Sequence, residues 1–452
     1  MKENKMGVMP IGRLIISMSL PIMISMLVQA LYNIVDSIFV ARISENALTA
    51  VSMAFPIQNL MIAVGVGTAV GVNALLARSL GAKDFEKVNK IATNAVFLAA
   101  MSYGVFLIIG LFLVEPFFRS QTDMEEIIQY GIDYLSICCC ASLGIFIQMM
   151  FERMLQATGK TIYSMYTQLS GAIVNLILDP ILIFGMFGIP AMGIKGAALA
   201  TVIGQMVAGA VAVIMNHKKN PEVQIHLKGF KPDKEIIGQI YQIAVPSIVM
   251  QAIGSVMNYG MNRILITFTS TATAVFGVYF KLQSFIFMPV FGLNNGIIPI
   301  MAYNYGAGNK DRVIKTMKTA VLYAVGILTF GFILFQVFTV PFLQLFEASE
   351  TMIAIGVPAL RIISISFPVA GFCIASGSSF QALGRATYSM INSIARQLLV
   401  LLPVAFVLAQ FGNVDLVWWC YPIAEIVSMT MTIIFLRKLN KEVISKIGHA
   451  QR

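Results

Sequence analysis

The chain has 452 residues, of which 58% are hydrophobic and only 12% are charged. Soluble domains carry roughly 25% charged residues, so this composition excludes most soluble enzymes. Lysine and arginine number 31 against 21 aspartate and glutamate residues, which gives a net charge of +10. In a soluble protein this excess would suggest nucleic acid as a partner, whereas in a membrane protein basic cytoplasmic loops account for it.

Apolar segments recur along the whole chain, separated by charged clusters and by Gly, Pro or Asn turns. Each is long enough to cross a hydrocarbon core of about 30 Å as a helix. They lack the period-two alternation of barrel strands, the only β structure that lipid admits. The sequence therefore predicts twelve transmembrane helices, of which the fourth and tenth are the least continuous. They lie near 12–41, 47–78, 90–115, 127–155, 161–187, 194–215, 237–267, 272–303, 316–340, 351–380, 387–410 and 416–436.

Basic residues are concentrated on one side of these spans. They occupy both termini, the connections that follow every second span, and the segment 216–235, whereas the opposite connections are mainly acidic. The positive-inside rule therefore predicts a multi-pass membrane protein with both termini in the cytoplasm. We expect it in the cell membrane, which is the inner membrane in a cell that has two membranes. The net charge then reflects orientation, and we expect no nucleic-acid partner.

Cysteine usage excludes other classes of site. The five cysteines show no paired CxxC spacing and no histidine at zinc-ligand distance, which indicates neither a disulfide framework nor a metal finger. The basic N-terminus leads into a long apolar span without a small-residue cleavage site, so we interpret it as a retained first helix.

The two halves of the chain repeat one another at an offset of 225 residues. Residues 67–96 align with 292–321 without a gap, with nine identities in thirty positions. Six spans per copy make a parallel duplication related by an axis along the membrane normal. We expect an all-α integral membrane protein with two pseudo-symmetric six-helix bundles, 1–215 and 236–452, joined by a linker at 216–235. Such bundles suit alternating access in a transporter, and the alternative is a structural scaffold.

Two acids lie inside predicted spans of the first half, Asp36 in the first and Asp179 in the fifth, at similar depth. Ionisable groups in the hydrocarbon core are costly, so each is a functional candidate. Gln29 and Asn33 share a helical face with Asp36, and Asn175 lies one turn from Asp179. These residues predict a polar site within the first bundle.

This carboxylate pair has several interpretations. Carboxylate and amide oxygens suit Na⁺, and they suit H⁺ equally well, because burial beside a second carboxylate favours a protonated acid. The structural alternative is a hydrogen-bonded pair that locks two helices. A membrane aspartyl hydrolase would also use two carboxylates, but neither acid stands in a GxGD setting, so we expect no enzyme.

The second half lacks this pair, since at the same offset Asp36 faces Met261 and Asp179 faces Val404. The coupling site should therefore belong to the first half alone. In the second half, polar and basic residues are candidates for lining a substrate cavity: Gln251, Asn258, Asn262, Lys281 and Gln283.

Further charged residues lie within the predicted spans, and their roles have alternative interpretations. Lys281 is expected either to line the cavity or to neutralise Glu425, and an ion pair that orients helices is the alternative. Arg396 is a second basic candidate for the cavity. Glu152 and Arg153, near the cytoplasmic end of the fourth span, predict a structural gate pair or interfacial charges.

Four segments resemble the multidrug and toxic compound extrusion (MATE) family of secondary transporters. They are PIMISMLVQALYNIVDSIFVARI in the first span, QATGKTIYSM before the fifth, NLILDPILIFG within it, and PIMAYNYGAGNKDRV after the eighth. The resemblance implies a cation site, possible for Na⁺, on Asp36, Asn175, Asp179 and Thr201. One branch of the family has further acids in the second half; here the seventh span has Gln251 and no acid. The chain is thus more similar to the branch that relies on the N-terminal aspartate.

The resemblance also implies a function. It predicts a monomer in the lipid bilayer that exports amphipathic, cationic drugs or toxins by antiport with H⁺ or Na⁺, without any other cofactor. The same superfamily includes flippases, so export of lipid-linked or other amphipathic metabolites is the alternative. A flippase should have a strongly basic cavity for phosphates, for which this sequence offers only Lys281 and Arg396.

Overall fold

The computed structural model describes residues 3–448, which are helical throughout their regular structure and contain no strand. Within them, ten helices are long and apolar enough to cross a membrane, and two further pairs of helices each pass the same test together. Counting each pair as one span gives the twelve spans that were predicted. The bent pairs, with angles of 45° and 47°, are the fourth and tenth spans, which explains their poor continuity in the sequence.

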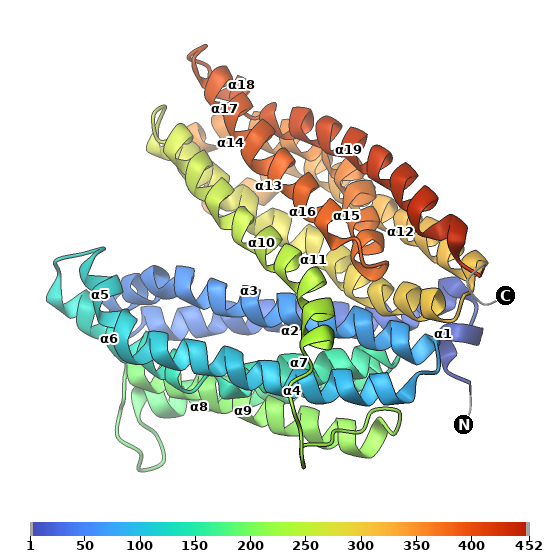
Figure 1. Cartoon of the computed structure of the whole chain (residues 1–452). Helices are drawn as coiled ribbons and strands as arrows, with labels where there is room; N and C mark the ends of the chain where they lie inside the picture. Colours follow the sequence, from blue (N-terminus) through green and yellow to red (C-terminus); the bar gives the residue numbers. More distant parts are fainter. Residues whose placement is uncertain (1–2, 449–452) are drawn as a thin grey trace. The chain divides into compact units, whose positions relative to one another are not determined.

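The chain divides into two compact units. One contains residues 24–245, and the other contains residues 1–23 together with 246–452. The first unit holds most of α2 (Ile11–Ala41), then α3 (Glu45–Gly81), α4 (Phe85–Ile108), the π-helical η1 (Ile109–Leu113), α5 (Val114–Arg119), α6 (Glu125–Cys140), α7 (Leu143–Ala157), α8 (Thr161–Phe184), α9 (Ile194–Lys219) and the start of α10 (Lys234–Leu265) (Figure 1).

The second unit holds the short α1 (Lys5–Val8), the beginning of α2 and most of α10. It continues with α11 (Ser270–Gly306), α12 (Lys310–Val337), α13 (Thr339–Gln344), α14 (Glu350–Ser364), α15 (Phe367–Ala382), α16 (Ala386–Ile394), the π-helical η2 (Ala395–Leu401), α17 (Leu402–Ala409), α18 (Val414–Val417), α19 (Cys420–Glu442) and the 3₁₀ turn η3 (Ile444–Lys446).

The helix boundaries repeat the 225-residue offset of the sequence. Helix α3 and its counterpart α11 begin and end at positions that differ by this offset, and so do the beginnings of α4 and α12 and of α6 and α14. The side chains of Ser44 and Thr269 cap α3 and α11 by accepting a backbone N–H three residues on. The duplication therefore extends to the local signals that start each helix.

The unit boundaries fall inside two helices and close to equivalent prolines. The boundary in α2 lies after Met23, two residues beyond Pro21, and the boundary in α10 lies at Pro246 itself. A proline inside a helix removes one backbone hydrogen bond and bends the helix readily. The compact units defined by residue contacts thus differ from the two bundles predicted from the sequence, which were separated by the linker at 216–235.

Glycines on α11 explain why the beginning of α2 packs in the second unit. A Cβ at Gly292 would lie 2.6 Å from the Met23 side chain, and a Cβ at Gly296 would lie 2.3 Å from the Ser19 hydroxyl. In the first unit, a Cβ at Gly71 of α3 would lie 2.5 Å from the Ile240 carbonyl oxygen of α10. Small residues let helices approach closely in membranes, so these glycines are points of helix contact.

Candidate functional site

The two acids predicted to form the site meet in the first unit. Asp36 comes from α2 and Asp179 from α8, and their carboxyl groups lie within hydrogen-bonding reach of each other. Asp179 is fully buried. In the described part of the chain, Oδ1 of each acid is buried without a hydrogen-bond donor, and neither acid forms a salt bridge. Two ionised carboxylates this close repel one another, so the arrangement favours a bound cation or a shared proton.

Asn175 and Thr201 complete the group. The Asn175 amide, one turn before Asp179 on α8, donates to Oδ2 of Asp179 at 3.1 Å and accepts the backbone N–H of Thr201 at 3.1 Å. The Thr201 hydroxyl donates to the Ala197 carbonyl oxygen within α9. The four residues named for a cation site thus come together from α2, α8 and α9.

Glycines allow α8 and α9 to lie side by side at this point (Figure 1). A Cβ at Gly204 would lie 3.1 Å from the Asn175 Cβ, and a Cβ at Gly171 would lie 2.9 Å from the Gly204 carbonyl oxygen. A Cβ at Gly196 would lie 2.4 Å from the Leu182 carbonyl oxygen. Without side chains here, the two backbones approach closely enough for Asn175 to reach the backbone of Thr201.

Two tyrosines near the acids were not predicted. Tyr32, one turn before Asp36 on α2, lies close to both acids, and Tyr134 of α6 lies close to Asp36. The Tyr134 hydroxyl accepts a hydrogen bond from the Gln58 amide at 3.2 Å. The four-residue spacing of Tyr32 from Asp36 could have revealed the first tyrosine, whereas nothing in the sequence pairs Tyr134 with the site.

The remaining predicted residues differ in their exposure. Gln29 and Asn33, the expected supports of Asp36, are exposed on α2. Of the substrate-cavity candidates in the second unit, Asn262 and Lys281 are exposed, and three are half-buried: Gln251, Asn258 and Gln283. The ammonium of Lys281 lies 5.9 Å from the centre of the Phe346 ring.

Glu425 is neutralised by a residue other than Lys281. A guanidinium nitrogen of Arg396 lies 2.7 Å from Oε1 of Glu425, and Glu425 is buried. This contact corrects the alternative in which Lys281 was the counter-charge. The pair joins η2 to α19 within the second unit.

Glu152 and Arg153 each form hydrogen bonds with glutamine side chains. Glu152 is buried and accepts hydrogen bonds from the amides of Gln148 at 2.9 Å and Gln168 at 3.2 Å. Arg153 donates to the side-chain amide oxygen of Gln156 at 3.0 Å. Helices α7 and α8 are therefore held together by a buried carboxylate and two amides.

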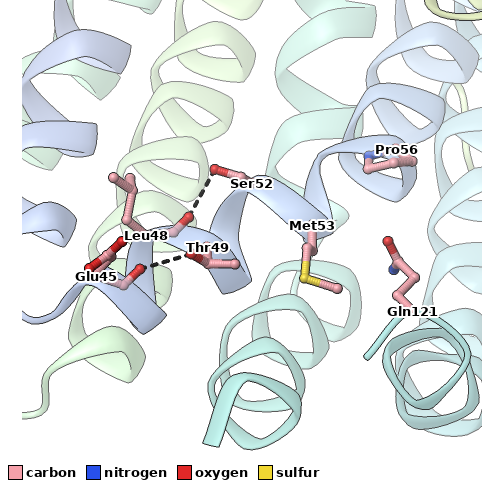
Figure 2. Close-up of a pocket in the computed structure, with 7 residues that line it drawn as sticks. All are labelled: Glu45, Leu48, Thr49, Ser52, Met53, Pro56 and Gln121. Carbon is pink, nitrogen blue, oxygen red and sulfur yellow. Dashed lines mark hydrogen bonds between the residues drawn. The ribbon is translucent and has the colours of Figure 1, made fainter. Parts of the chain in front are cut away.

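A pocket of about 500 Å³ lies near the beginning of α3. Figure 2 shows its lining, Glu45, Leu48, Thr49, Ser52, Met53, Pro56 and Gln121. The hydroxyls of Thr49 and Ser52 donate to carbonyl oxygens of their own helix. The pocket includes none of the predicted site residues, and its hydroxyl donors are already used.

A model of the family described as MatE matches the chain twice, over residues 21–181 and 246–407. The chain belongs to this family. The two matched segments begin at Pro21 and Pro246, so each copy of the repeat is matched separately. The protein is therefore a MATE transporter with many membrane-spanning helices, and not an enzyme.

Known MATE proteins resemble the chain over nearly its full length. "Multidrug export protein MepA" of Staphylococcus haemolyticus (strain JCSC1435) is 29% identical over 410 residues, which cover 90% of this chain and 89% of that protein. MepA of Staphylococcus aureus (strain MRSA252) is 26% identical over 413 residues, or 90% of each chain. A MATE crystal structure in complex with MaL6 has a TM-score of 0.91 at 25% identity and covers 99% of both chains.

Proposed function

We propose that this MATE transporter exports amphipathic, cationic drugs or toxins from the cell by antiport with H⁺ or Na⁺. The observation that carries the proposal is the buried contact between Asp36 and Asp179. Both carboxyl groups keep an oxygen without a donor, and neither is neutralised by a basic side chain in the described residues. The similarity to multidrug export proteins supports drugs as the substrate class.

Both coupling ions fit the site. A proton shared between Asp36 and Asp179 would satisfy the two oxygens that have no donor and relieve their repulsion. A sodium ion would be held by those same oxygens, with the Asn175 carbonyl and Thr201 hydroxyl as further hard ligands.

Transport then follows from differential binding. The coupling ion and the substrate favour different states of the transporter, so an ion gradient drives the expulsion of substrate. Substrate would contact the polar residues proposed for the second unit, Gln251, Asn258, Asn262, Lys281 and Gln283. Asn258 supports this role because its carbonyl oxygen has no hydrogen-bond partner among the described residues.

The topology belongs to the same proposal. The basic termini and the segment 216–235 would lie in the cytoplasm, and the transporter would act as a monomer in the cell membrane. Cationic substrates would then be exported from the cytoplasmic side, where the protein carries most of its basic residues.

The flippase alternative has less support. A cavity for phosphate groups needs several free basic side chains, and the sequence offers Lys281 and Arg396. Because Arg396 is paired with the buried Glu425, only Lys281 is without an acidic partner among the described residues. The first unit contributes two acids instead.

Transport of a cationic dye into or out of proteoliposomes tests the proposal, with a pH gradient and a Na⁺ gradient imposed separately. One gradient should drive dye accumulation, and Asp36→Asn should abolish it without loss of folded protein. Asp123→Asn is the matched control, because Asp123 is exposed in the loop before α6 and should leave transport unchanged. Full activity of Asp36→Asn would remove this residue from the coupling mechanism.

A further inference from the structure

The helix pair that carries the site in the first unit has a counterpart in the second. Helix α8 spans Thr161–Phe184, and at the 225-residue offset it corresponds to α16, η2 and α17, which together span 386–409. Helix α9 corresponds to α19 within one residue at its beginning. The second unit therefore has counterparts of the two helices that carry Asn175, Asp179 and Thr201.

The second helix pair also holds a carboxylate at the level of the first site. At the 225-residue offset Glu425 corresponds to Ala200, which is adjacent to Thr201. Glu425 is 7% exposed, and its Oε2 is buried without a hydrogen-bond partner among the described residues. A buried acid with an unsatisfied oxygen thus lies on α19, one position from the counterpart of Thr201.

The difference between the two helix pairs is a guanidinium. Arg396 bonds Oε1 of Glu425 at 2.7 Å, whereas its counterpart Gly171 has no side chain and packs against Gly204 and Ala208. The backbone differs at the same place, because Arg396 lies in the π-helical η2 while α8 is α-helical throughout. Single π-helical turns inside α-helices occur frequently at functional positions.

The other groups that face the pair are neutral. Tyr279 of α11 and Tyr421 of α19 lie close to the pair, and Cys373 of α15 lies close to Glu425. Among residues 3–448, Arg396 is the basic side chain that forms a salt bridge with Glu425. If the guanidinium were removed, Glu425 would be a buried carboxylate without a counter-charge, which is strongly unfavourable.

We infer that Arg396 is a built-in counter-cation that closes a second, structurally equivalent ion site around Glu425, and so restricts the coupling cation to the first unit. The inference rests on the proposed function, in which Asp36 and Asp179 bind that cation. On this inference, one residue, Arg396, is the reason why the coupling cation binds in the first unit alone. Withdrawal of the guanidinium opens the Glu425 site to Na⁺.

An ordinary structural ion pair would behave differently. Loss of a purely structural arginine lowers stability in any buffer. A closed ion site predicts instead that the loss of Arg396 creates new binding, which raises the thermal stability of the variant as cation is added. A gain of Na⁺ binding is an outcome that a structural role does not produce, whereas stabilisation by falling pH follows for any buried carboxylate that has lost its counter-charge.

The experiment measures thermal unfolding of purified, detergent-solubilised protein in the Asp36→Asn background, where the first site is disabled. Arg396→Met is compared with Arg396→Lys, which keeps a positive charge, and with Arg396→Met combined with Glu425→Gln. The Tm of each protein is measured in NaCl and in choline chloride at equal ionic strength. In a separate series, Tm is measured as the pH is lowered. Arg396→Gln replaces Arg396→Met if the latter does not yield folded protein.

A local spectroscopic signal is available at the same site. The chain has two tryptophans, Trp418 and Trp419, and both lie within two turns of Glu425 at the beginning of α19. Trp418 is fully buried. Intrinsic tryptophan fluorescence therefore reports on this region of the second unit and contains no contribution from the first.

The expected result for Asp36→Asn with Arg396→Met is a rise in Tm and a change in tryptophan emission with Na⁺. Asp36→Asn alone, the lysine variant and the variant with Glu425→Gln should not respond to Na⁺. A folded Arg396→Met protein that is stabilised by falling pH and not by Na⁺ overturns the inference, because any unpaired buried carboxylate behaves in that way. A Na⁺ response of Asp36→Asn alone that Glu425→Gln removes also overturns it.

The proposed function is judged separately in the parent protein. If the parent shows no cation effect that Asp36→Asn removes, coupling at the first site fails. The Arg396 comparison still decides whether the second helix pair holds a closed ion site, because it is made without the first site.

Discussion

The contact between α8 and α9 at Gly196 offers a quantitative test of how the candidate site is positioned. In Gly196→Ala, the new Cβ would lie 2.4 Å from the Leu182 carbonyl oxygen and 2.5 Å from its carbon, where ordinary contact begins at 3.4 Å. These are backbone atoms of a helix and cannot rotate away. The two helices would have to separate by about 1 Å at this point.

The cost can be worked from this separation. Overpacking of a tight contact costs about 1–3 kcal/mol. The hydrogen bond from the Thr201 N–H to Asn175, now 3.1 Å, would lengthen beyond bonding range, and its net value is about 0.5–1.5 kcal/mol. We expect Gly196→Ala to lower the free energy of unfolding by about 1.5–4.5 kcal/mol and to weaken cation binding at the site.

Gly104→Ala is the matched control. Gly104 lies inside α4, and a Cβ there meets no atom within 4 Å. Alanine is favoured over glycine inside a helix by about 0.5–1 kcal/mol, so this variant should be as stable as the parent or slightly more stable. Thermal unfolding in detergent, with and without the coupling cation, compares the two variants. Equal Tm values for Gly196→Ala and Gly104→Ala would refute the argument from close backbone contact.

Two further variants test contacts away from the site. Glu152→Ala leaves two half-buried amide groups without their acceptor, and each lost hydrogen bond is worth about 0.5–1.5 kcal/mol, so its Tm should fall. Glu86→Ala, at an exposed ion pair, should leave Tm unchanged. Arg312→Ala removes hydrogen bonds to two carbonyl oxygens that hold α1 and the start of α2, so limited proteolysis should cut the N-terminus faster than in Lys315→Ala. Equal cleavage rates would contradict that anchoring role.

Much of the fold could be predicted because its signals are local. Apolar length predicted the spans, and the internal repeat predicted two bundles whose helices begin at equivalent positions. The fourth and tenth spans looked irregular because each bends between two helices, at Ala141-Ser142 and at Ile365-Ser366. Burial cost alone singled out Asp36 and Asp179, since few acids lie within spans.

The partners of the charged residues could not be predicted in the same way. Arg396 and Glu425 lie on different helices, and their contact depends on the π-helical geometry of η2, for which the sequence has no reliable signal. Lys281 was an equally plausible partner by depth. Tyr134 reaches the first site from α6, a helix that the spacing of polar residues along α2 and α8 does not constrain.

The packing units and the repeated sequence units differ for a physical reason. The segment between α9 and α10 is held to the first unit, because Asn89, Thr93 and Asn94 of α4 accept backbone N–H groups from it. A linker tied down in this way cannot absorb a change in conformation. The compact units are instead joined through α2 and α10, each close to a proline that lacks a backbone donor. We therefore expect the alternating access predicted from the repeat to bend these two helices at Pro21 and Pro246, and not the segment 216–235.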